Sequence, residues 1–163
     1  MQDNLGRNIN YIRVSITDRC NLRCRYCMPE EGHALKPHED ILRLEEISRL
    51  IKIGAELGIS KVRFTGGEPL IRRGLVDLIE MVSAIKTIDD IALTTNGLMF
   101  ASVASDLKKA GLNRVNISLD TLNAERYSYI TRGGSLAQAV SGLEAAITYD
   151  LHPVKINTVV ING

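Results

Sequence analysis

The chain has 163 residues, of which 45% are hydrophobic and 24% charged, and its formal net charge is +1 at pH 7. This balance is typical of a globular domain, and it excludes the strongly basic surface of a nucleic-acid or anionic-membrane binder. No apolar run approaches the roughly 20 residues of a membrane span, and the N-terminus lacks the apolar core of a signal peptide. We therefore expect one cytoplasmic domain over residues 1–163, with no nucleic-acid or membrane partner.

Strands and helices alternate along the whole chain. Strands are predicted, in chain order, at residues 11–17, 62–65, 91–95, 115–119 and 154–161. Helices are predicted between them at residues 44–57, 75–85, 102–110, 124–129 and 136–149. Gly58 and Gly111 follow two of these helices as typical helix ends. A long loop containing cysteine and proline separates the first strand from the first helix. This order predicts an α/β fold with a parallel sheet and right-handed crossovers.

Each predicted strand alternates apolar with polar residues, as in Ile12, Arg13 and Val14. Strands covered by helices on both faces read instead as continuous apolar runs. We therefore expect a curled sheet, a partial TIM-type barrel of about five βα units, whose polar face lines a ligand cavity. An open sheet with one wet face is the alternative. The polar face would carry Arg13, Arg63, Thr94, Ser118 and Lys155.

The three cysteines, Cys20, Cys24 and Cys27, follow the first predicted strand with the spacing C-x3-C-x2-C. Three thiolates can ligate three irons of a four-iron cluster and leave the fourth iron open to a small molecule. The position agrees with this, since βα folds place their chemistry at the carboxyl ends of strands.

Zinc is a second interpretation, because His33 or His38 could join the three cysteines as the fourth ligand of a tetrahedral site. The x3 spacing and the lack of a second cysteine pair count against zinc. Unmetallated reactive thiols are a third interpretation. We assign no function to His33, His38 or His152.

A Gly-Gly turn, Gly66 and Gly67, follows the second predicted strand and continues into Glu68 and Pro69. Paired glycines let a ligand approach the backbone and leave amides free to bind it, and Glu68 could accept a hydrogen bond from a ligand ammonium. Together with the cysteine loop, in which Tyr26 precedes the third cysteine, this turn resembles the signature of the radical S-adenosylmethionine (SAM) superfamily.

Within that superfamily, several segments resemble the GTP 3′,8-cyclases of molybdenum cofactor biosynthesis. They are residues 11–24, 27–32, 62–72, 94–97 and 116–120. The resemblance implies a [4Fe-4S] cluster on Cys20, Cys24 and Cys27. It implies S-adenosyl-L-methionine contacts from Tyr26, Gly67 and Ser118. It implies GTP contacts from Arg13, Arg63, Thr94 and Lys155.

The implied reaction cleaves SAM reductively to a 5′-deoxyadenosyl radical, which takes hydrogen from C3′ of GTP before C3′ bonds to C8 of guanine. No residue stands out as a general acid or base. A flavodoxin- or ferredoxin-like reductant is an expected partner, and exposed sheet edges allow a homodimer. We expect Arg72 and Arg73 to be solvated and leave them outside the site.

Members of that family are about twice as long and carry a second cluster on three further cysteines. All three cysteines here are used by the first cluster, so we expect the chain to be a fragment that lacks part of the GTP site and full cyclase activity. Other interpretations are a radical enzyme acting on a peptide or another metabolite, a zinc-stabilised binding module, and a fold that binds nothing.

Overall fold

A single parallel sheet organises the computed structural model, which describes residues 2–160 apart from the side chain of His38. Its strands are β1 (Tyr11–Ser15), β2 (Lys61–Thr65), β3 (Asp90–Thr95), β4 (Arg114–Ser118) and β5 (Lys155–Asn157). The helices are α1 (Leu44–Glu56), α2 (Leu75–Ser83), α3 (Phe100–Lys109), α4 (Ala124–Thr131) and α5 (Leu136–Thr148). Two 3-10 turns, η1 (His38–Asp40) and η2 (Pro69–Ile71), lie in the connections after β1 and β2.

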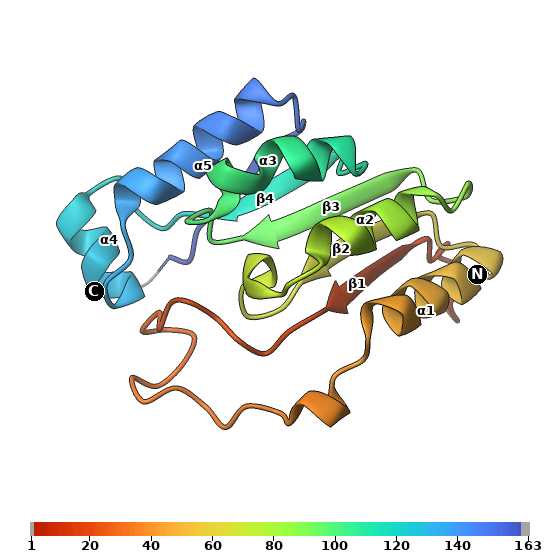
Figure 1. Cartoon of the computed structure of the whole chain (residues 1–163), viewed down its shortest axis with the longest axis horizontal. Helices are drawn as coiled ribbons and strands as arrows, with labels where there is room; N and C mark the ends of the chain where they lie inside the picture. The colour runs from red at the N-terminus through yellow and green to blue at the C-terminus, as the bar shows by residue number, and fades with distance from the viewer. Residues whose placement is uncertain (1, 161–163) are drawn as a thin grey trace.

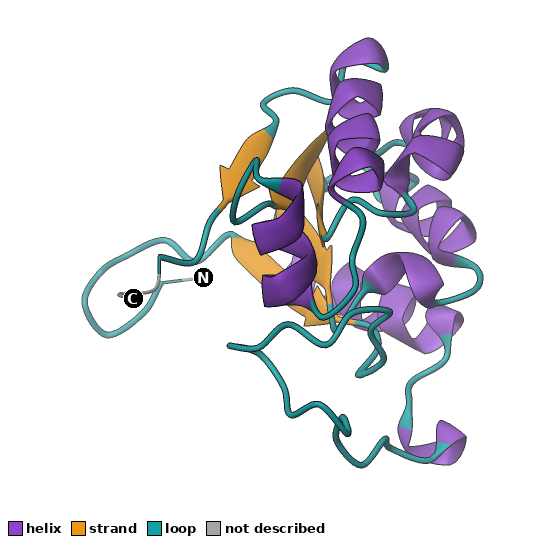
Figure 2. Cartoon of the chain, turned by 90° about the vertical axis from the view of Figure 1, so that its left-hand side faces the viewer, coloured by secondary structure: helices purple, strands orange, loops and turns teal. Residues whose placement is uncertain are grey.

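The strands lie side by side in chain order, β1-β2-β3-β4-β5, and every pairing is parallel. Since consecutive crossovers share one hand, a sheet that never reverses its order receives its helices on one face. Figure 2 shows the helices gathered on one side of the strands. This arrangement is the wall of a partial TIM-type barrel, which confirms the predicted α/β class.

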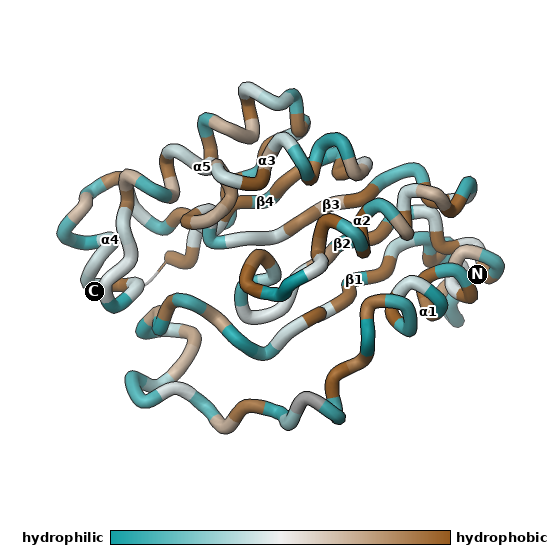
Figure 3. The backbone as a smooth tube through the Cα atoms, in the orientation of Figure 1, coloured by the Kyte–Doolittle hydropathy of each residue, from teal (hydrophilic) through white to brown (hydrophobic). Residues whose placement is uncertain are grey.

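The core lies between the sheet and the helices. Apolar strand residues such as Phe64, Leu93 and Ile117 are fully buried there against Leu78 of α2 and Leu107 of α3. The hydrophobic colour in Figure 3 follows the central strands and the helix faces next to them. The apolar half of the alternation is thereby buried in β2, β3 and β4, whereas Ile156 of β5 remains exposed.

Two helix ends confirm the glycine prediction. Gly58 and Gly111 adopt φ angles of +100° and +108°, in the left-handed region that favours glycine. After each glycine the chain turns back: the Ile59 amide donates to the Gly54 carbonyl at 3.0 Å, and the Leu112 amide donates to the Leu107 carbonyl at 2.9 Å. These bonds satisfy carbonyls that the helix end would leave unpaired.

The last strand is much shorter than predicted, since β5 covers only Lys155–Asn157, and residue 161 lies outside the described residues. Where β5 ends, hydrogen bonds that involve side chains take the place of the backbone hydrogen bonds between the strands. The Thr158 hydroxyl donates to the Leu119 carbonyl at 2.8 Å, and the Val159 amide donates to Oδ1 of Asp120 at 2.9 Å. These side-chain bonds move the backbone out of strand register after Asn157. No helix of the described residues is long and apolar enough to cross a membrane.

Candidate functional site

The cysteine loop leaves the carboxyl end of β1 and returns to α1, so it lies along the edge of the sheet where the strands end (Figure 1). A tight turn brings the second and third cysteines together: the amides of Cys27 and Met28 donate to the Cys24 carbonyl at 2.9 and 3.1 Å. Cys20 and Cys24 are half-buried, and Cys27 is exposed. Cys27 is therefore the most accessible of the three thiols.

Burial opposes ionisation of two of the three thiols. Burial, followed by repulsion from Cys20 and Cys27, raises the pKa of Cys24 to about 11. Burial also raises the pKa of Cys20, although the Leu22 amide donates to its sulfur at 3.4 Å. Metal ligation requires the thiolate, so a bound metal would have to offset this cost of burial.

The described residues contain no ready-made site for a single metal ion. Within the described part of the chain, no three His, Cys, Asp or Glu side chains converge on one ion position. One tetrahedral zinc would bring thiolate sulfurs within about 4 Å of one another, because each Zn–S bond is about 2.3 Å. Thiolates that bind separate irons of a cluster need not converge in this way. His33 is exposed, and the side chain of His38 lies outside the described part of the structure.

The Gly-Gly turn after β2 packs against the start of the cysteine loop. A Cβ placed on Gly67 would meet the Arg19 carbonyl oxygen at 2.2 Å, so only glycine allows this approach. The amides of Gly67 and Glu68 donate to the carbonyls of Thr17 and Arg19 at 2.8 and 2.7 Å. The expectation that the amides of Gly66 and Gly67 are free for a ligand is therefore wrong for Gly67, whose amide the protein itself uses.

Glu68 also differs from expectation. Its buried carboxylate accepts three protein hydrogen bonds: Oε1 from the Thr95 hydroxyl at 2.8 Å and the Leu70 amide at 3.0 Å, and Oε2 from the Asn96 amide at 2.8 Å. Burial raises the pKa of Glu68, and these donors partly oppose that shift. The side chain joins the ends of β2 and β3 and is not presented to a ligand.

The register of the sheet places the predicted ligand residues on one face. Arg13 of β1 lies directly opposite Arg63 of β2. Thr94 of β3 lies opposite Asn116 of β4, and Asn116 lies opposite Lys155 of β5. Because paired residues share a face and side chains alternate, Ser118 belongs to the same face, one level nearer the cysteine loop. Tyr26 and Gly67 lie at the carboxyl edge above that face.

Positive charge on this face is only partly neutralised. Arg114 pairs with Asp90 through a 2.7 Å salt bridge that is largely buried. Among the described residues, Arg13, Arg63 and Lys155 form no ion pair with a carboxylate. The Arg63 guanidinium lies 5.4 Å from the Tyr11 ring centroid, and its Nε is buried without a partner. The face thus offers unpaired cations to an anionic ligand.

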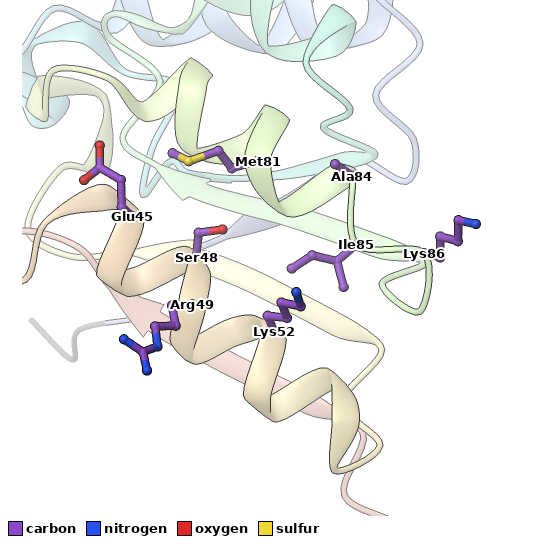
Figure 4. A pocket seen from close by; sticks show the side chains of 8 residues that line it. All are labelled: Glu45, Ser48, Arg49, Lys52, Met81, Ala84, Ile85 and Lys86. Carbon is purple, nitrogen blue, oxygen red and sulfur yellow. The ribbon is translucent and has the colours of Figure 1, made fainter.

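A hollow of about 530 Å³, which three basic residues and Glu45 help to line, lies between α1 and α2. Arg49, Lys52 and Lys86 line it (Figure 4). Because it belongs to the helix layer, it is separate from the polar face of the sheet. None of its lining residues is a cysteine, so its arginine, Arg49, can serve as a control for the arginines of the sheet face.

Three residues near the site lay outside the sequence-based site prediction. Arg72 was expected to be solvated, but its guanidinium donates to the Ile16 and Leu42 carbonyls and holds both ends of the loop. Asp120 accepts a hydrogen bond from the Tyr26 hydroxyl. Arg132 donates to two carbonyls of the cysteine loop. The family-like segments that contain Arg72 and Asp120 were the only signal in the sequence, and nothing pointed to Arg132.

A family comparison matches residues 14–163 to the Radical SAM superfamily. The chain is 60% identical over all 163 residues to a GTP 3′,8-cyclase of Pelotomaculum thermopropionicum and 58% identical to one of Syntrophomonas wolfei. In both alignments the chain is covered completely and the relative to 50% of its length. The chain therefore spans about half the length of the curated relatives it matches.

Solved structures support the fold. Streptococcus suis SuiB bound to S-adenosylmethionine superposes with a TM-score of 0.70 at 20% identity, over 94% of this chain and 35% of that chain. Methylornithine synthase superposes with a TM-score of 0.73 at 19% identity, over 91% of this chain and 44% of that chain.

Proposed function

Because this chain belongs to the radical SAM superfamily, we propose that it is the N-terminal part of a GTP 3′,8-cyclase, with residues 1–163 forming part of the radical SAM core. The observation that carries the proposal is the pairing of Arg13 with Arg63 on a polar face that ends at the cysteine loop. The relatives named above are GTP 3′,8-cyclases at 58–60% identity. A triphosphate requires clustered guanidinium and ammonium groups, and this face supplies them.

Cys20, Cys24 and Cys27 would hold three irons of a [4Fe-4S] cluster and leave one iron for S-adenosyl-L-methionine. When bound, the cluster supplies the electron that cleaves SAM reductively. Tyr26 and Ser118 would contact SAM from the loop and from the end of β4. Gly67 would do so through its carbonyl oxygen, which accepts no hydrogen bond from the described residues, whereas its amide is already used.

Arg13, Arg63, Thr94 and Lys155 would bind GTP. The guanidinium and ammonium groups suit the triphosphate, and the Thr94 hydroxyl suits a neutral polar group of the nucleotide. These residues bind and orient the substrate, and we assign none of them as a general acid or base. The role of the protein is to hold GTP against SAM in a site that excludes water.

The reductant would be a flavodoxin- or ferredoxin-like protein, and a reducing cytoplasm would suit the exposed thiol of Cys27. β1 and β5 are the edges of the described sheet, and they offer backbone groups to a second copy of the chain.

Metal analysis and GTP titration test the proposal. After anaerobic reconstitution we expect a brown protein with about four irons and four sulfides per chain, lost in Cys27→Ser. Arg63→Ala should weaken GTP binding by about tenfold or more, because a charged hydrogen-bond donor is removed. Arg49→Ala, in the hollow of Figure 4, is the matched control and should bind GTP as the original chain does.

Two results would contradict the proposal: a colourless protein with one zinc, or equal GTP affinity of the Arg63→Ala and Arg49→Ala variants. Cyclic product from GTP, SAM and a reductant would instead show that these 163 residues suffice, against the expectation that they are a fragment.

A further inference from the structure

Arg132 joins the two sides of the cysteine turn. Its Nη1 donates to the Arg23 carbonyl at 2.6 Å and to the Met28 carbonyl at 2.9 Å. These two residues flank residues 24–27, which contain the second and third cysteines. One guanidinium nitrogen therefore closes the turn that presents both thiols.

The end of α4, which immediately precedes Arg132, receives the other side of the loop. The Arg23 amide donates to the Thr131 carbonyl at 3.3 Å, and the Arg25 amide donates to the Ile130 carbonyl at 2.9 Å. The last carbonyls of a helix lack partners within the helix, so the loop supplies donors that the helix end requires. Amides of the cysteine loop thus donate to carbonyls at the end of α4, and the Arg132 side chain donates to carbonyls of the loop.

The backbone of Arg132 has a conformation that arginine seldom adopts. Arg132 follows α4 with φ +54° and ψ +59°, a left-handed conformation in which glycine or asparagine is favoured at helix ends. An arginine is therefore unfavourable for the backbone at this position. Its Nε is also buried without a hydrogen-bond partner among the described residues.

We propose that Arg132 is a positioning residue for the cluster: it holds residues 24–27 in the conformation that presents Cys24 and Cys27. The role of Arg132 toward a cluster rests on the proposed function. Its effect on the conformation of residues 24–27 does not, because that effect can be measured on the chain without iron. The test therefore measures the metal-free chain and the loaded chain separately.

The first measurement is amide hydrogen exchange of the metal-free chain in Arg132→Gly, Arg132→Lys and Arg126→Gln. Glycine fits the left-handed backbone, so Arg132→Gly should keep or raise the melting temperature while residues 24–28 exchange about tenfold faster. Arg132→Lys should restore most of the protection, because one nitrogen makes both bonds. Arg126, which is exposed on the same helix, is the matched control.

The second measurement is loss of iron to a chelator after reconstitution, which should be about fivefold or more faster in Arg132→Gly than in Arg126→Gln. Unchanged exchange of residues 24–28 in Arg132→Gly would overturn the inference. So would unfolding of that variant, or faster exchange spread evenly over the chain, because either would show a general structural role. If the original chain takes no iron, the proposed function fails, and the exchange data still decide the role of Arg132.

Discussion

The Tyr26 hydroxyl donates a hydrogen bond to Oδ2 of Asp120 at 2.8 Å. The bond ties the cysteine loop to the segment that follows β4, across 94 residues of sequence. Burial, then the hydrogen bond to Asp120 and its charge, raise the pKa of Tyr26, so the phenol remains a neutral donor. The aromatic ring before the third cysteine is thereby held above the polar face.

Two variants of Tyr26 distinguish the contribution of its hydroxyl from that of its ring. Tyr26→Phe should lower the free energy of unfolding by about 1 kcal/mol, the usual net value of one hydrogen bond, and should retain SAM binding. Tyr26→Ala should also weaken SAM binding by about tenfold, because the proposed contact of the ring with SAM would be lost. Urea unfolding and equilibrium titration measure the two effects. Tyr129→Phe is the control, because its exposed hydroxyl has no hydrogen-bond partner among the described residues.

Glu68→Gln should lower the free energy of unfolding by about 1–3 kcal/mol, measured in urea at pH 7. A glutamine amide would place an N–H group against the Asn96 or Leu70 amide, both of which donate to the carboxylate in the original chain. If the free energy of unfolding is unchanged, these hydrogen bonds contribute nothing to stability. The conclusion that Glu68 holds the ends of β2 and β3 together would then be wrong.

The same residue predicts a pH dependence. Burial raises the folded pKa of Glu68 above its ordinary value of 4.5, so the folded state binds the proton more tightly than the unfolded state. The difference in unfolding free energy between the original chain and Glu68→Gln should therefore be largest below pH 4.5 and fall as pH rises through the folded pKa. A difference that grows with pH would mean that the hydrogen bonds outweigh burial.

Gly67→Ala should destabilise the cysteine loop, because its Cβ would lie 2.2 Å from the Arg19 carbonyl oxygen. Overpacking of this kind costs about 1–3 kcal/mol, and it should also lower iron uptake during reconstitution. Gly133→Ala is the comparison: its Cβ would meet nothing within 4 Å, and only its φ of +103° is unfavourable. If Gly133→Ala lowers iron uptake as much as Gly67→Ala does, the close approach of Gly67 to the Arg19 carbonyl does not explain why position 67 is glycine.

The ion pair between Asp90 and Arg114 should matter more than a surface pair. Asp90→Asn would leave a largely buried guanidinium without its carboxylate and should lower the free energy of unfolding by about 3 kcal/mol. Asp106→Asn removes an exposed partner of Lys109, 3.8 Å away, and should change it by less than about 1 kcal/mol. Thermal and urea unfolding of both variants provide the measurement, and equal effects would contradict the prediction.

Much of the fold was accessible from local pattern. The positions of the strands and helices followed from periodicity, and most predicted bounds agree with the structure to within two residues. β5 is the exception, because its length depends on whether the chain stays in register with β4, which periodicity alone does not determine. The shared face of Arg13, Arg63, Thr94, Ser118 and Lys155 was also predictable, since side chains alternate along a strand.

Local spacing is enough to predict the parallel α/β order, the polar face and the three-cysteine loop, because each depends on residues that lie a few positions apart. Tertiary structure alone decided what holds that loop. Asp120 lies 94 residues from Tyr26, and Arg132 lies 109 residues from Arg23, so no local pattern connects them. It also decided that Glu68 and the Gly67 amide bind protein groups, because the ends of β2 and β3 and the loop meet only after folding. The cysteines were identifiable from their spacing, whereas the residues that position them were identifiable only from their contacts.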